Sequence, residues 1–130
     1  MIEAIRRELE DDPRIGYALL FGSAARATSH ARSDIDIAVG GLDPRGFDTL
    51  ALGDLTARLE TASGRPVHLV LLDEAPPGLA YRVFRDGKPL LVRREAAFRD
   101  RLARAILEYL DFKPVEDLFT RGVLRARHGR

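Results

Sequence analysis

Residues 20–39 read LFGSAARATSHARSDIDIAV, and this stretch decides what the chain can fold into. It opens inside an apolar run, Gly16 to Phe21, which is typical of a strand buried on both faces. Gly22 interrupts the run, and Ser23 is suited to cap a helix over the residues that follow. A second strand is predicted over Ser33 to Val39, because polar and apolar residues alternate there.

The polar residues of this stretch have a physical use where the pattern puts them. Gly22 lets the backbone approach a phosphate closely, the N–H groups of the following helix turn attract the anion, and the Ser23 hydroxyl adds a donor. Asp34 and Asp36 share one strand face, where two carboxylates repel each other unless a cation lies between them. Each piece alone is common in turns, caps and edge strands, but the order and spacing together predict a site for phosphate and Mg²⁺.

The rest of the chain supplies elements that could form one sheet covered by helices. Apolar spacing and turn residues predict helices over about 2–10, 47–62, 78–86 and 98–113, and further strands over 67–72 and 89–92. The last helix is expected to end before Pro114, and its Phe98, Leu102, Ile106 and Leu110 are expected to form one apolar stripe. The fold class is therefore α/β (α+β), with a mixed sheet of about four strands flanked by helices.

Length and composition limit the classes of protein to consider. The chain has 130 residues, of which 45% are hydrophobic and 32% charged, as in a soluble globular domain. It contains no cysteine, so we expect no disulfide or thiolate zinc site and a reducing, cytoplasmic location. No apolar run approaches the roughly 20 residues that span a bilayer, and a net charge of +1 gives no general attraction to nucleic acid.

The last residues of the chain differ from the rest in charge. The final ten positions carry only basic charges, on Arg121, Arg125, Arg127, His128 and Arg130. We therefore predict a folded domain over residues 1–112 and a basic extension over 113–130. The extension could be a solvated tail or could contact an acidic partner or RNA. Either it or the last helix, whose apolar surface Ala105 and Tyr109 widen, is expected to contact a partner chain.

The pattern of Gly22-Ser23, ten residues, then Asp34-x-Asp36 resembles the signature of the DNA polymerase beta-like nucleotidyltransferase superfamily. The segment GSAARATSHARSDIDIAV is similar to GSxARG…SDIDLAV of its minimal nucleotidyltransferase (MNT) branch. The likeness continues through VHLVLLDEAPPGLAYRVFRDGKPLLVRRE and covers about the first hundred residues. It implies a nucleotidyltransferase fold.

The resemblance also implies a reaction and a partner. Members of the branch are antitoxins of HEPN-domain ribonuclease toxins, and they move AMP from ATP to a tyrosine of that toxin. By this resemblance Gly22 and Ser23 would hold the triphosphate, Asp34 and Asp36 would hold Mg²⁺, and Arg26 would touch the phosphates or remain solvated. A complex with the toxin is expected, and no direct contact with nucleic acid or membrane.

The chain departs from the superfamily at His68, where relatives carry a third carboxylate in the next strand. Imidazole is a poor Mg²⁺ ligand, but a neutral histidine could accept the proton of the acceptor hydroxyl. Asp73 and Glu74 are nearby candidates for a replacement carboxylate. Three hypotheses stay open: an active protein adenylyltransferase, an inactive module that neutralises its toxin by contact, and an adenylyltransferase for a small molecule such as an aminoglycoside.

Overall fold

The computed structural model describes residues 1–22, 34–43 and 47–128. The predicted helix after Gly22, with Ser23 and Arg26, lies outside these residues. The elements follow in the order α1 (Ile2–Glu10), β1 (Tyr17–Phe21), β2 (Ile35–Gly40), α2 (Thr49–Ser63), β3 (Val67–Leu71), the 3-10 turn η2 (Leu72–Glu74), α3 (Pro77–Asp86), β4 (Lys88–Val92) and α4 (Glu95–His128).

The sheet has four strands in the order β3-β2-β1-β4. β1 runs antiparallel to both β2 and β4, whereas β2 and β3 run parallel, so the predicted mixed sheet is confirmed. β4 lies at an edge, as Pro89 indicated, and its register against β1 shifts between Ala18 and Leu19. The central strands β1 and β2 are buried along nearly their whole length.

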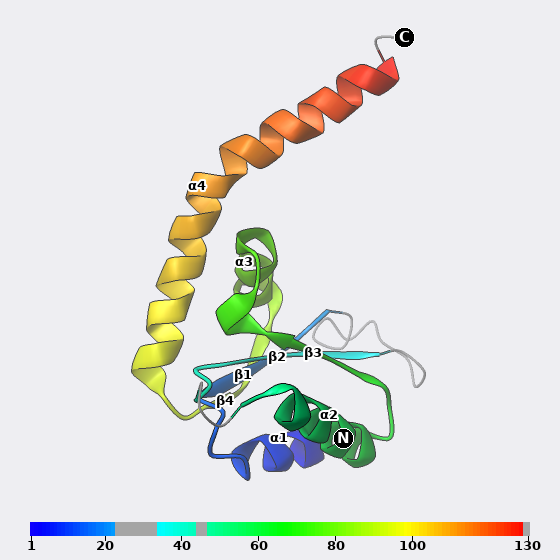
Figure 1. Cartoon of the computed structure of the whole chain (residues 1–130), viewed down its shortest axis with the longest axis vertical. Helices are drawn as coiled ribbons and strands as arrows, with labels where there is room; N and C mark the ends of the chain where they lie inside the picture. Colours follow the sequence, from blue (N-terminus) through cyan, green and yellow to red (C-terminus); the bar gives the residue numbers. More distant parts are fainter. Residues whose placement is uncertain (23–33, 44–46, 129–130) are drawn as a thin grey trace.

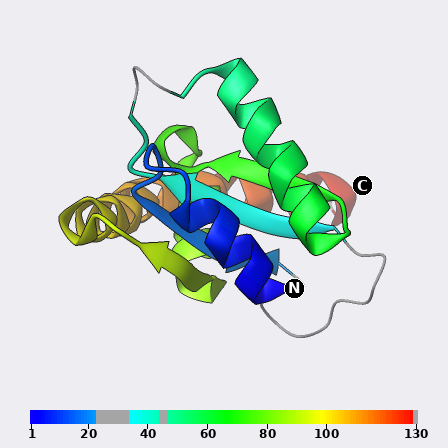
Figure 2. The same ribbon diagram turned by 90° about the horizontal axis from the view of Figure 1, so that it is seen from below.

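Helices cover both faces of the sheet, with α1 and α2 on one side and α3 and the first part of α4 on the other (Figure 1). Seen from below, α1 and α2 lie side by side across the strands (Figure 2). Alternate side chains of β2 pack into two separate cores, one on each face of the sheet. The core under α1 and α2 contains Ile5, Leu9, Ile35, Ile37, Leu55 and Leu59 among others, and the core under α3 and α4 contains Tyr17, Leu19, Ala38, Leu72, Val83 and Ala105.

The expected end of the last helix before Pro114 is wrong, because α4 continues to His128 with Pro114 inside it. Proline removes one backbone hydrogen bond and crowds the preceding turn, which bends a helix without always ending it. Figure 1 shows α4 changing direction in its orange part. Within the described residues, no helix is both long and apolar enough to cross a membrane.

The predicted apolar stripe of α4 is only partly correct. Phe98 and Leu102 are half-buried, but Ile106 is 44% and Leu110 60% exposed. A residue every four positions advances about 40° around a helix of 3.6 residues per turn, so this stripe winds away from the body. The buried face passes instead through Arg101 and Ala105, and it is extended by ring contacts from α3: Tyr81 with Tyr109 at 4.0 Å, and Phe84 with Phe98 at 5.5 Å between centroids.

A buried carboxylate fastens the turn after α1 to α2. Asp12 is 3% exposed and accepts hydrogen bonds from Arg14 Nε at 2.8 Å, Arg14 Nη2 at 2.7 Å and Arg58 Nη2 at 3.0 Å. The hydrogen bond from the Arg14 side chain is the main reason that the pKa of Asp12 falls from 3.8 to about 2, although burial acts in the opposite direction.

Replacing Asp12 with Asn should lower the free energy of unfolding by about 2 kcal/mol at neutral pH. A pKa lowered from 3.8 to about 2 stabilises the fold above pH 3.8. This contribution is lost as the pH falls toward about 2, so the variant and the wild type should converge there. Urea unfolding across that range would measure the difference, with the exposed neighbour Asp11→Asn as the control. A difference that stays constant down to pH 2 would contradict the assignment.

Candidate functional site

Three of the predicted site residues meet at one end of the sheet. Gly22 directly follows β1, Asp36 is the second residue of β2, and His68 is the second residue of β3. In the strand register Asp36 lies opposite both Phe21 and His68, so the end of β1 and the starts of the other two strands are adjacent. Asp34 is exposed and precedes β2 by one residue.

The side chains of Asp36 and His68 contact each other. His68 Nδ1 lies 3.3 Å from Asp36 Oδ1, and the side chains are 66% and 28% exposed respectively. When Nδ1 carries the proton, it donates to the carboxylate and leaves Nε2 free to accept a proton from solvent or a substrate. Ala38 and Val70, two residues further along the same strands, pack in the core under α3, so this pair faces the α3 side of the sheet.

Gly22 is required by its backbone angle and by its neighbour. Its φ of +71° lies in the left-handed region that side chains disfavour. A Cβ at this position would also overlap the carboxylate of Asp36, with Oδ2 as the nearest atom. The glycine therefore allows the backbone to pass directly beside Asp36, where a bound phosphate could reach both.

The described residues fit a Mg²⁺ site that a nucleotide completes. No lysine or arginine of the described part of the chain pairs with Asp34 or Asp36, so no cationic side chain there competes with a metal ion for these carboxylates. No three acidic or histidine side chains within the described ranges come close enough to hold a metal by themselves. Mg²⁺ is usually bound by one or two carboxylates, with substrate phosphates and water as the other ligands.

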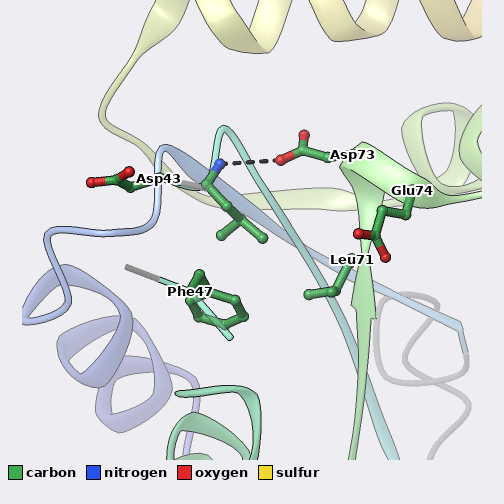
Figure 3. Close-up of a pocket in the computed structure, with 6 residues that line it drawn as sticks. Asp43, Phe47, Leu71, Asp73 and Glu74 are labelled. Carbon is green, nitrogen blue, oxygen red and sulfur yellow. Dashed lines mark hydrogen bonds between the residues drawn. The ribbon is translucent and has the colours of Figure 1, made fainter. Parts of the chain in front are cut away.

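Asp73 and Glu74 lie at the other end of β3 and cannot replace the missing third carboxylate. Asp73 accepts hydrogen bonds from the backbone N–H groups of Gly41 at 3.2 Å and Leu42 at 3.1 Å, beyond the end of β2. Asp73 is five positions after His68, and β3 ends between them at Leu71, so the strand carries the chain about 10 Å before the turn begins. Figure 3 shows both carboxylates beside a pocket of about 260 Å³ that Phe47 and Leu71 also line. This pocket is remote from Gly22 and Asp36.

A second pocket of about 260 Å³ adjoins Gly22 itself. Phe21 and Gly22 line one side, and α3 residues, including Leu79, Arg82 and Arg85, line the other. Sequence reasoning missed these arginines, because only the packing of α3 on this face of the sheet brings them to the end of β1. Their three-residue spacing on a predicted helix indicated a shared face and nothing more.

The mixed sheet, with Gly22 after one strand and Asp36 near the start of the next, is the arrangement of a nucleotidyltransferase. The family model for Polymerase beta, Nucleotidyltransferase matches residues 3–96. The chain belongs to this family and is MNT-like within it, which confirms the resemblance seen in the sequence.

Similar proteins place the chain more closely. It is 38% identical over 78 residues to the protein adenylyltransferase MntA of Shewanella oneidensis, a match that covers 60% of this chain and 55% of that protein. The chain thus spans about half the length of this curated relative. A crystal structure of a toxin–antitoxin complex with AMP-PNP contains a chain with a TM-score of 0.81 and 29% identity, covering 95% of this chain and 98% of that one.

Another similar structure is that of a tri-AMPylated Shewanella oneidensis HEPN toxin in complex with its MNT antitoxin. The matched chain has a TM-score of 0.74 and 26% identity, and the match covers 95% of this chain and 99% of that one. The predicted nucleotidyltransferase fold is therefore confirmed over nearly the whole chain. The roles of the individual site residues stay predictions.

Replacing Gly22 with Ala should reduce stability more than replacing Gly64 with Ala. Both glycines have a positive φ, +71° and +69°, so each alanine should cost roughly 1–2 kcal/mol in backbone strain. A Cβ at Gly64 meets nothing within 4 Å, whereas at Gly22 it displaces the Asp36 carboxylate. Urea unfolding of Gly22→Ala, Asp36→Ala and the double variant would measure the coupling. Equal losses at both glycines would show that Asp36 does not crowd Gly22.

Proposed function

We propose that this protein moves AMP from ATP to a hydroxyl group with the help of Mg²⁺, and that the acceptor is a tyrosine of a HEPN-family toxin. The protein would then act as the antitoxin of that toxin. The observation that carries this proposal is the meeting of Gly22, Asp36 and His68 at one end of the sheet. The likeness to chains from AMPylating toxin–antitoxin complexes supports it.

Each predicted site residue has its own role in the proposed reaction. Gly22 and Ser23 hold the triphosphate through backbone N–H groups and the hydroxyl, with Arg26 as a further phosphate contact. Asp34 and Asp36 hold Mg²⁺, which neutralises phosphate charge when bound. His68 Nε2 accepts the proton of the acceptor hydroxyl as its oxygen bonds to the α-phosphorus and pyrophosphate leaves. Its contact with Asp36 orients the ring for this transfer.

The partner proposal draws on the surface of α4 as well as on the similar proteins. Three apolar side chains of this helix are exposed within little more than one turn: Ile106 at 44%, Leu107 at 64% and Leu110 at 60%. They lie close to Tyr109, whose ring contacts Tyr81 of α3, but on a face of α4 that α3 leaves exposed. Beyond them α4 extends away from the body (Figure 1). We propose that the HEPN toxin covers this face. The division into a domain over residues 1–112 and a basic extension over 113–130 also stays a prediction.

A second candidate function is neutralisation of the toxin by contact alone. It is favoured by His68, where the resemblance to the superfamily predicts a carboxylate, because imidazole is a poor ligand for Mg²⁺. The two functions differ in whether labelled ATP modifies the toxin, and the following two predictions separate them.

Replacing both Asp34 and Asp36 with Asn should abolish Mg²⁺-dependent ATP binding and leave the fold intact. Removal of two neighbouring like charges should raise the stability of the nucleotide-free protein slightly, if it changes it at all. Isothermal titration calorimetry with Mg·ATP would measure binding, and thermal unfolding would report the fold. The matched control is Asp43→Asn/Asp73→Asn at the opposite end of the sheet. Unchanged Mg·ATP affinity in the folded double variant would refute the metal assignment.

Replacing His68 with Ala should slow AMP transfer to the toxin by roughly 10²–10⁴-fold and leave Mg·ATP affinity nearly unchanged. The loss arises because no side chain then accepts the hydroxyl proton. His68→Asp restores an oxygen ligand and should retain or raise the rate with Mg²⁺. Transfer of AMP from labelled ATP would measure both variants. A wild-type rate in His68→Ala would exclude the general base, and transfer seen only in His68→Asp would identify a toxin-binding protein without chemistry.

A further inference from the structure

The pocket beside Gly22 continues the candidate site toward α3. Gly22 contacts Asp36 on one side and lines the pocket on the other, so it separates the carboxylate from the α3 arginines. Asp36 and His68 mark where the α-phosphate must lie, because the acceptor hydroxyl is deprotonated there. A triphosphate that runs from this point past the Gly22 backbone brings its β- and γ-phosphates to the pocket.

Two arginines of α3 line that pocket, and they differ in whether another side chain binds the guanidinium. Arg85 forms two 2.9 Å hydrogen bonds with Asp86, and its guanidinium lies over the ring of Tyr81, 5.7 Å from the centroid. Arg82 is exposed and has no hydrogen bond or ion pair with any described residue. Asp86 also lines the pocket but is bonded to Arg85, so the guanidinium of Arg82 is available to a ligand.

We propose that Arg82 binds the β- and γ-phosphates of the nucleotide, a role that rests on the proposed adenylyl transfer. A guanidinium donates two parallel hydrogen bonds to a phosphate and stays charged at any physiological pH. The other residues of the pocket are the apolar Phe21, Leu79 and Val83, and Asp86, which is bonded to Arg85. Arg82 thereby also stabilises the negative charge that builds up on pyrophosphate as the bond to the α-phosphorus breaks.

Replacing Arg82 with Gln tests the role through binding alone. Loss of a charged hydrogen-bond donor should weaken Mg·ATP binding roughly 10- to 100-fold, because such bonds are the stronger class. AMP has no β- or γ-phosphate, so its affinity should change by less than about twofold. Inorganic tripolyphosphate should compete with ATP in the wild type and compete less well in the variant. Arg82→Lys keeps the charge but not the planar group that donates two hydrogen bonds, so its Mg·ATP affinity should lie between those of the wild type and Arg82→Gln.

The matched control is Arg99→Gln, an exposed arginine of α4 that makes the same change in net charge. It should bind ATP and AMP like the wild type. Unchanged ATP affinity in Arg82→Gln, or an equal loss for ATP and AMP, would overturn the phosphate role while leaving adenylyl transfer in place. A wild type that binds no Mg·ATP would instead overturn the proposed function, and the role of Arg82 with it.

Discussion

The register of β2 between β1 and β3 is the constraint on which the site depends. Antiparallel pairing places Phe21 opposite Asp36, and parallel pairing places Asp36 opposite His68. A slip of one residue in either pair would turn Asp36 to the α2 side and bury a carboxylate among apolar side chains. The two cores oppose such a slip, because Ile35 and Ile37 fill one of them and Ala38 the other. Packing of the neighbouring residues on both faces of β2 therefore fixes the geometry of the site.

The four strands could be predicted from the sequence because each has a local cause. Alternation places Asp36 on the face of β2 opposite to Ile35 and Ile37, and a continuous apolar run marks β1 as buried on both faces. The predicted strand face shared by Asp34 and Asp36 is not seen, because β2 begins at Ile35. The end of α4 could not be predicted in this way. Pro114 indicates a disturbed helix, but whether the chain stops or bends there depends on neighbouring contacts and not on the proline alone.

Other features depend on which elements pack on the same face of the sheet, and the sequence pattern does not determine this. Asp73 is five residues from His68 along the chain, yet the extended strand β3 between them carries it to the opposite end of the sheet. Arg82 is sixty residues from Gly22, yet the packing of α3 on the same face brings both to one pocket. Asp73 is thus near His68 in the sequence but far from it in the fold, whereas Arg82 is far from Gly22 in the sequence but near it in the fold.

The histidine in β3 alters the charge of the site as well as its ligands. A third carboxylate at position 68 would lie beside Asp36 and raise the repulsion that a metal must relieve, whereas a neutral imidazole donates a hydrogen bond to that carboxylate. In the proposed site, two carboxylates would attract Mg²⁺ less strongly than three, and the nucleotide phosphates would supply more of the ligand oxygens. In the proposed reaction metal and nucleotide would therefore bind as a unit. Cationic side chains such as Arg82 would then matter more than in a site with three carboxylates, because the phosphates carry charge that one metal ion does not neutralise.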